Sequence, residues 1–195
     1  MSFLDAAIAT ALGLAVSSMT VAQTMPLAKD RAETQTEIHL TVKSTSIQQD
    51  TPMSAHFSAY GDGVSPQIKW SSMVGAKSYA VVVEDPDAKS PMPVVHWLVW
   101  NIPSTATELP EGMLPSTFVG LTQGKNSHGT TGYFGPHPPI GDPMHHYHFQ
   151  VFALDQVLGV PAGADRDALL TAMKGHVVAS GELVALFQQW AKVTQ

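Results

Sequence analysis

The chain has 195 residues, of which 44% are hydrophobic and 13% charged, with 14 prolines and 15 glycines. This composition is typical of one loop-rich, mainly β domain with a good core rather than of a disordered chain. The net charge of −6 and the lack of a basic run argue against binding of nucleic acid or anionic membranes through bulk electrostatics. The absence of cysteine excludes disulfides, thiolate metal sites and cysteine catalysis.

Residues 1–23 are predicted to be a signal peptide. The apolar run 6–16 resembles the hydrophobic region of such a peptide, and Ala22 is a small residue at a plausible cleavage point. The run is too short to predict a membrane span, and the residues before it include Asp5 but no lysine or arginine, which is unusual for an export signal. We therefore expect a periplasmic or secreted protein, with a retained N-terminal helix and a cytoplasmic location as the alternative.

Residues 24–34 have the composition of a polar linker, and we expect the folded domain to span 35–195. Its first strand is predicted over Glu37–Lys43, where apolar and polar residues alternate. A short strand follows at 68–70. The stretch 78–84 is nearly all apolar and β-branched, which predicts a central strand buried on both faces.

The second half of the chain predicts two more strands and two helices. Residues 95–102 and 145–154 form the strands, and the irregular segment 104–144 between them is long enough to suggest a function or tight packing. The helices are predicted at about 165–174 and 177–191, the second because four apolar side chains repeat at helical spacing. Those side chains are Leu183, Leu186, Phe187 and Trp190.

Two segments combine rigid loops with titratable side chains. The first runs from Asp85-Pro86-Asp87-Ala88 to Val95-His96-Trp97, and the second, over 133–149, contains Pro138-Pro139 and His145-x-Tyr147. Proline and glycine hold a loop in one shape, while histidine can donate to anions, accept from cations or bind a metal. Together the segments predict a small-molecule site.

These motifs resemble the paired signatures of the phosphatidylethanolamine-binding protein family, in particular of its bacterial Raf-kinase-inhibitor-like (YbhB/YbcL-type) branch. Supporting segments extend the resemblance from about Ile38 to Phe187. They include Gly63-Val64-Ser65-Pro66, Trp100-Asn101-Ile102-Pro103 and Met173-Lys174-Gly175-His176-Val177. The resemblance implies a mainly β, Greek-key β-sandwich with peripheral and C-terminal helices, and one small surface pocket for phosphate or a phosphorylated headgroup.

The resemblance also implies which residues bind the ligand. They are Asp85, His96, Pro138, Pro139, His145 and Tyr147, to which we add Trp97 as an apolar wall. The residue chemistry agrees, because imidazoles, a phenol and loop N–H groups can donate to an anion, and a carboxylate can hold an imidazole in one tautomer. We find no lysine or arginine within these motifs and therefore expect weak, shallow binding.

A metal site is the main alternative. His146 and His148 form a His-x-His pair of the kind found in cupin-type metal-dependent enzymes. If 145–154 is a strand, His145 and Tyr147 share one face, and His146 and His148 share the other. The anion pocket and the metal site would therefore use opposite faces of one strand.

The sequence contains no serine-hydrolase elbow, glycine-rich phosphate loop or zinc-protease motif, and no motif places a nucleophile beside the histidines. We therefore expect a binding or regulatory protein that is not an enzyme and needs no cofactor. Its expected partner is a small anionic or phosphorylated ligand. The resemblance also raises a homodimer and, by analogy with animal relatives that inhibit protein kinases, a regulatory role, although a fold does not determine a function.

Overall fold

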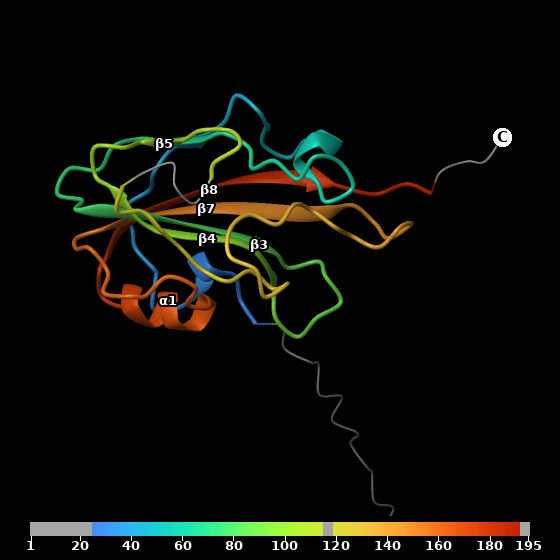
Figure 1. Cartoon of the computed structure of the whole chain (residues 1–195). Coiled ribbons are helices and arrows are strands. Elements are labelled where there is room, and N and C mark those ends of the chain that lie inside the picture. The colour runs from blue at the N-terminus through green and yellow to red at the C-terminus, as the bar shows by residue number, and fades with distance from the viewer. Residues whose placement is uncertain (1–24, 115–118, 192–195) are drawn as a thin grey trace, which may run out of the picture.

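Two antiparallel β-sheets and an α-helix make up the fold in the computed structural model, which describes residues 25–114 and 119–191 (Figure 1). The predicted signal peptide at 1–23 lies outside these residues. In the described part of the chain, no helix is both long and apolar enough to cross a membrane.

The larger sheet has the strand order β6-β4-β3-β7-β8 and the smaller one β1-β2-β5. The larger sheet consists of β3 (Ser78–Asp85), β4 (Val94–Pro103), β6 (Thr122–Gln123), β7 (His145–Leu154) and β8 (Val177–Phe187). The smaller sheet consists of β1 (Val42–Lys43), β2 (Ile68–Trp70) and β5 (Glu108–Leu109), and short 3-10 turns lie at Ala28–Asp30 and Ala55–Phe57. The helix α1 (Arg166–Met173) starts at Asp165, whose carboxylate accepts a hydrogen bond from the Ala168 N–H.

The centre of the larger sheet is buried on both faces, as β3 shows. Tyr79, Val81 and Val83 point into the core between the two sheets, whereas Ala80 and Val82 point toward the layer that contains α1. Figure 1 shows the helix on one side of the sheet and β5 on the other. The prediction of a central strand buried on both faces is confirmed, and so are the β-sandwich and the first C-terminal helix.

The predicted helix at 177–191 is wrong, because Val177–Phe187 forms the edge strand β8, which pairs with β7. Leu183, Ala185 and Phe187 alternate along the strand and are buried in the core between the sheets. Trp190, the last member of the supposed helical stripe, is 68% exposed. The four apolar residues therefore fit helical spacing only by chance, because the segment follows the two-residue repeat of a strand.

The first predicted strand is shorter than expected. Only Val42–Lys43 pairs with β2, and Ile38, expected on the apolar face, is 49% exposed. The preceding backbone instead runs parallel to β8: the Leu40 N–H donates to the Ser180 carbonyl at 2.8 Å, and the Ser180 N–H donates to the Ile38 carbonyl at 3.0 Å. This segment therefore covers part of an otherwise free sheet edge.

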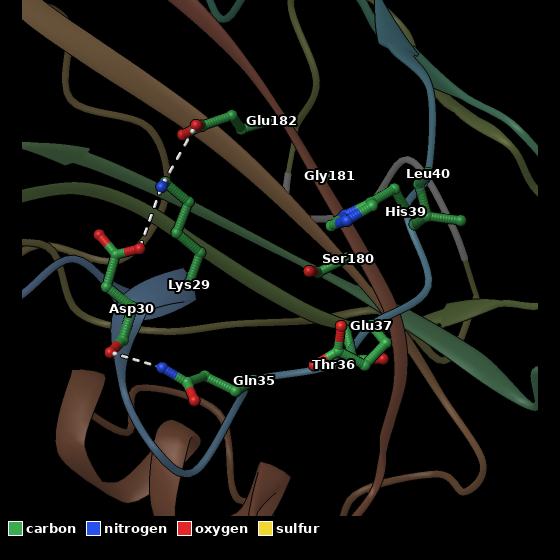
Figure 2. A pocket seen from close by; sticks show the side chains of 10 residues that line it. All are labelled: Lys29, Asp30, Gln35, Thr36, Glu37, His39, Leu40, Ser180, Gly181 and Glu182. Carbon is green, nitrogen blue, oxygen red and sulfur yellow. Dashed lines mark hydrogen bonds and ion pairs between the residues drawn. The ribbon is translucent and has the colours of Figure 1, made fainter.

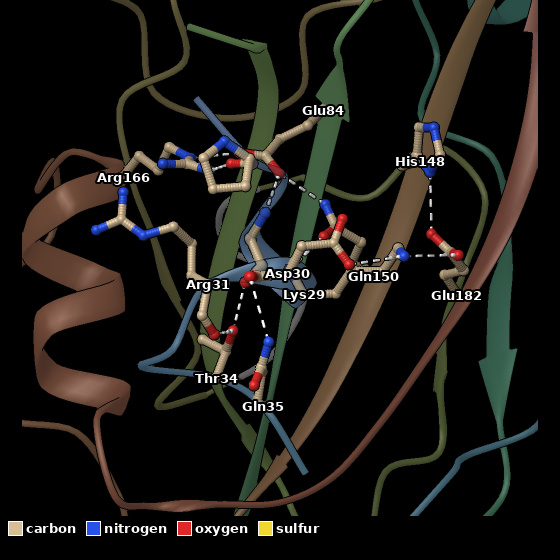
Figure 3. A network of polar contacts seen from close by, with 12 residues as sticks. Lys29, Asp30, Arg31, Thr34, Gln35, Glu84, His148, Gln150, Arg166 and Glu182 are labelled. Carbon is tan, nitrogen blue, oxygen red and sulfur yellow. Dashed lines mark hydrogen bonds and ion pairs between the residues drawn. The ribbon is translucent and has the colours of Figure 1, made fainter. Parts of the chain in front are cut away.

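Residues 25–34, expected to be a linker, pack on the outer face of the larger sheet. Ala28 is fully buried, and its N–H donates to the carboxylate of Glu84 at 2.7 Å. The same carboxylate accepts from Gln150 Nε2 at 2.8 Å and from the guanidinium of Arg166. Figure 3 shows this network, which ties the N-terminal segment, the sheet and α1 together.

Candidate functional site

A cavity of about 270 Å³ lies where β3 ends and β7 begins. Among the residues that line it are five of the seven predicted from the sequence. They are Asp85, His96, Pro138, Pro139 and His145. Strand ends and the loop between β6 and β7 therefore bring the two sequence motifs together into one site.

A buried carboxylate–imidazole pair forms one wall of this pocket. The Nδ1 atom of His145 lies 2.8 Å from Oδ2 of Asp85, and both side chains are 4% exposed. The other carboxylate oxygen of Asp85 accepts from the Asp87 N–H at 2.8 Å, which fixes its orientation. His145 therefore turns Nε2 away from this pair, and that atom lies 3.9 Å from Oδ2 of Asp142, beyond hydrogen-bond distance.

A β-bulge places His96. In the pairing of β3 with β4, Val83 faces Trp97 and the next residue, Glu84, faces Val95, so His96 is the extra residue. Bulges of this kind redirect side chains and are common beside functional sites. The bulge leaves His96 without a partner across the ladder, at the position from which its ring lines the pocket.

Both ring nitrogens of His96 are buried, but only one has a partner. Nδ1 lies 2.7 Å from the carbonyl oxygen of Phe134, whereas Nε2 has no partner among the described residues. The rings of Phe134 and Tyr147 pack against the imidazole at centroid distances of 5.9 and 5.1 Å. Burial lowers the pKa of His96, against smaller upward effects of the Phe134 carbonyl and the charge of Asp85.

The structure places two predicted residues behind the pocket rather than in its lining. Trp97 is fully buried in the core between the sheets, where its Nε1 donates to Oε1 of Gln123 at 2.8 Å. Tyr147 is 1% exposed and supports the ring of His96. Its hydroxyl has no partner among the described residues, and burial raises the pKa of Tyr147 well above its ordinary value. Both residues therefore shape the pocket through packing.

Several lining residues were not predicted. They are Lys89, His128, Phe134, His137 and Asp142, together with Ala88 and Val94. The prediction that the site contains no cation is wrong. Lys89 lies at the pocket rim, where its Nζ is 2.9 Å from Oδ1 of Asp142. Lys89 and Asp142 lie inside the two sequence segments that predict the site, whereas His128 lies outside both and reaches the pocket only through the fold.

The two faces of β7 separate the histidines as the sequence predicted. His145 and Tyr147 are buried, while His146 and His148 point the other way. The Nδ1 of His146 lies 2.7 Å from Asp87, and the Nδ1 of His148 lies 2.9 Å from Glu182. These two histidines thus have different carboxylate partners, and the described residues contain no group of three histidine, aspartate or glutamate side chains arranged to hold a metal ion.

A second cavity, of about 390 Å³, lies on the outer face of the larger sheet beside the N-terminal segment (Figure 2). The ammonium in its lining is already paired, because Nζ of Lys29 lies 3.0 Å from Asp30 and 3.4 Å from Glu182. None of the buried polar atoms that lack a partner among the described residues belongs to its lining. The pocket around His96 is therefore the better candidate for a specific ligand.

Comparison with known proteins agrees with this fold and with the order of the motifs. The model of the phosphatidylethanolamine-binding protein family matches residues 43–188. A UPF0098 protein of Pyrococcus horikoshii is 43% identical over 141 residues, which cover 69% of this chain and 70% of that protein. A UPF0098 protein of Methanothermobacter thermautotrophicus is 36% identical over 156 residues, which cover 77% of this chain and 99% of that protein.

Solved structures show the same similarity. Escherichia coli YbcL, described as a member of the mammalian phosphatidylethanolamine-binding protein family, has a TM-score of 0.73 at 30% identity, covering 77% of this chain and 98% of that one. A homologue from Chlamydia trachomatis has a TM-score of 0.70 at 32% identity, with the same coverage. The chain therefore belongs to the phosphatidylethanolamine-binding protein family.

Proposed function

We propose that this protein binds a small oxyanion, such as phosphate or a phosphorylated headgroup, in the pocket around His96, and that it does so without catalysis. The observation that carries the proposal is the buried pair of Asp85 and His145 beside the unpartnered Nε2 of His96. Such fixed and desolvated polar groups are typical of a ligand site, because an empty pocket leaves their hydrogen-bonding capacity unused.

The lining suits a small phosphoryl group. The ammonium of Lys89 at the rim and Nε2 of His145, when that ring carries its second hydrogen, can both donate to anionic oxygens. Pro138 and Phe134 supply apolar walls, which strengthen these interactions by excluding water. The family description, phosphatidylethanolamine-binding protein, supports a phosphorylated headgroup as the ligand class.

Titration of the purified protein with phosphate and phosphoethanolamine tests the proposal. His145→Ala removes one wall of the pocket and should weaken binding by roughly tenfold or more, because a hydrogen bond to a charged group is lost. His146→Ala is the matched control, since it lies next in sequence but on the other face of β7 and is half exposed. We expect this control to bind like the unmodified protein.

Two results would overturn the proposal. One is an absence of oxyanion binding by the unmodified protein at millimolar ligand. The other is a stoichiometric metal, detected by elemental analysis, that is lost in His146→Ala. The second result would favour the metal-dependent alternative based on His146 and His148.

We also propose that the protein is exported to the periplasm or secreted, because the sequence of residues 1–23 resembles a signal peptide. Cell fractionation with mass determination of the purified protein tests this. An uncleaved protein confined to the cytoplasm would contradict it. The homodimer that the family resemblance raised stays a prediction, which light scattering can check.

A further inference from the structure

His96 offers the pocket a hydrogen-bond acceptor. Its Nδ1 lies 2.7 Å from the carbonyl oxygen of Phe134, and because a carbonyl oxygen only accepts, Nδ1 must carry a ring hydrogen. A neutral imidazole has one such hydrogen, so Nε2 is left with a bare lone pair. That atom is buried and has no partner among the described residues, and a donor on a ligand in the pocket that His96 lines would satisfy it.

The surroundings of His96 favour this neutral form. The imidazole is enclosed by the rings of Phe134 and Tyr147, and the whole residue is 2% exposed. Removal from water lowers the pKa of His96, and the charge of Asp85 offsets this only in part. A ligand that contacts Nε2 therefore pairs with it through an O–H or N–H group.

The charges around the pocket disfavour a dianion. Six titratable or charged groups line the pocket together with His96. They are Asp85 at the end of β3, Lys89 in the next loop, His128 after β6, His137 and Asp142 before β7, and His145 on β7. The two carboxylates outnumber the single ammonium, which is already paired with Asp142. A second negative charge on the ligand would add repulsion that a monoanion avoids.

We infer that the pocket selects the hydrogen-bearing monoanion of a phosphoryl group, whose P–OH donates to Nε2 of His96 while its ionised oxygens accept from donors such as the ammonium of Lys89. The inference rests on the proposed oxyanion binding and adds the protonation state of the ligand. Hydrogen phosphate and phosphate monoesters have this chemistry. A phosphodiester, as in an intact phospholipid headgroup, has no P–OH and is disfavoured.

Calorimetric titration of the unmodified protein at pH 6 with matched ligands tests this. Dimethyl phosphate has the charge of monoanionic methyl phosphate without its hydroxyl, and sulfate has the shape of phosphate without a hydrogen. We expect methyl phosphate and phosphate to bind roughly tenfold or more tightly than these two, because the analogues leave Nε2 unpaired. Phosphoethanolamine should likewise bind more tightly than glycerophosphoethanolamine, which separates a free monoester from a lipid headgroup.

The pH dependence gives an independent measurement. A phosphate monoester loses its second hydrogen with a pKa of about 6, so the binding of methyl phosphate should weaken between pH 6 and pH 8. Dimethyl phosphate does not titrate in this range and reports any change in the protein itself. Methyl phosphate binding that weakens no more than this control would contradict the inference.

The outcomes separate the inference from the function on which it rests. Sulfate or dimethyl phosphate binding as tightly as the hydrogen-bearing ligands would overturn the inference and leave oxyanion binding intact. Equal binding of phosphoethanolamine and glycerophosphoethanolamine would assign the donor to the ammonium and overturn the P–OH assignment. Failure of every oxyanion to bind would overturn both. His96→Gln, whose amide can also donate, should bind phosphate and sulfate alike, and a preference retained in a folded His96→Gln would remove His96 from the explanation.

Discussion

Replacing Arg166 with methionine tests the buried ion pair that anchors the N-terminal segment. The side chains of Arg166 and Glu84 are 3% and 0% exposed. The carboxylate of Glu84 also accepts from the Ala28 N–H at 2.7 Å and from Gln150 Nε2 at 2.8 Å (Figure 3). Methionine keeps much of the aliphatic volume but leaves this carboxylate with neutral donors and without its cation.

In Arg166→Met, the carboxylate of Glu84 can either stay charged or take up a proton. The expected loss of stability is set by whichever of the two costs less free energy. Staying charged after removal of one partner of a buried pair costs about 3–5 kcal/mol. Taking up a proton, for a glutamate with an ordinary pKa of about 4.3, costs about 3.7 kcal/mol at pH 7 and about 1 kcal/mol at pH 5. Because the lower-energy alternative prevails, we expect the free energy of unfolding to fall by about 3–4 kcal/mol at pH 7 and by about 1–2 kcal/mol at pH 5.

Urea unfolding followed by tryptophan fluorescence, at both pH values, measures this difference. A loss below about 1 kcal/mol at pH 7, or the same loss at both pH values, would refute the reasoning about a buried charge. Arg31→Met is the matched control, because Arg31 pairs with Glu33 near the surface and its loss should change stability little. Adding Glu84→Gln to Arg166→Met removes the stranded charge and should restore much of the stability.

Two further predictions concern the loops and the sheet edge. A Cβ on Gly135 would lie 2.5 Å from the backbone oxygen of Phe57, so Gly135→Ala should destabilise by about 1–3 kcal/mol in thermal unfolding, whereas Gly159→Ala, with open space around it, should not. Burial raises the pKa of Glu182, but the hydrogen bond from His148 and other charges outweigh it and lower the pKa. Its stabilisation is therefore present above about pH 4.5 and lost as the pH falls further, and Glu182→Gln should reduce this acid-side decrease in Tm; an unchanged decrease would contradict it.

The incorrect prediction of a helix at 177–191 shows what a sequence pattern alone cannot decide. Leu183 and Phe187 suit the apolar face of a helix and of a strand equally well, so spacing alone could not decide. Val177, Val178 and Gly181 were evidence against a helix, since β-branched residues and glycine have low helix propensity. The decisive cause is tertiary: the strand pairs with β7 and meets the backbone of the segment before β1 at Gly181.

The candidate site was predictable where it depends on alternation and motif order. The shared face of His145 and Tyr147 follows from strand geometry, and the meeting of Asp85 with His145 follows from the family's signatures. The orientation of His96 was not predictable, because it depends on a bulge and on the Phe134 carbonyl 38 residues away. Contacts supplied by long loops are determined by the packing of the whole domain, which no local pattern encodes.

Glu84 and Asp85 are consecutive in β3, yet their side chains stabilise two different parts of the molecule. Glu84 binds the backbone N–H of Ala28, and Arg166 binds the carbonyl of Pro26, while the next residue, Asp85, fixes a pocket imidazole. This arrangement limits how far the N-terminus can be trimmed by a protease or in a shortened protein. A new terminus before Pro26 keeps the anchor, whereas removal of Ala28 leaves the buried carboxylate of Glu84 short of a donor, next in sequence to Asp85 of the candidate pocket.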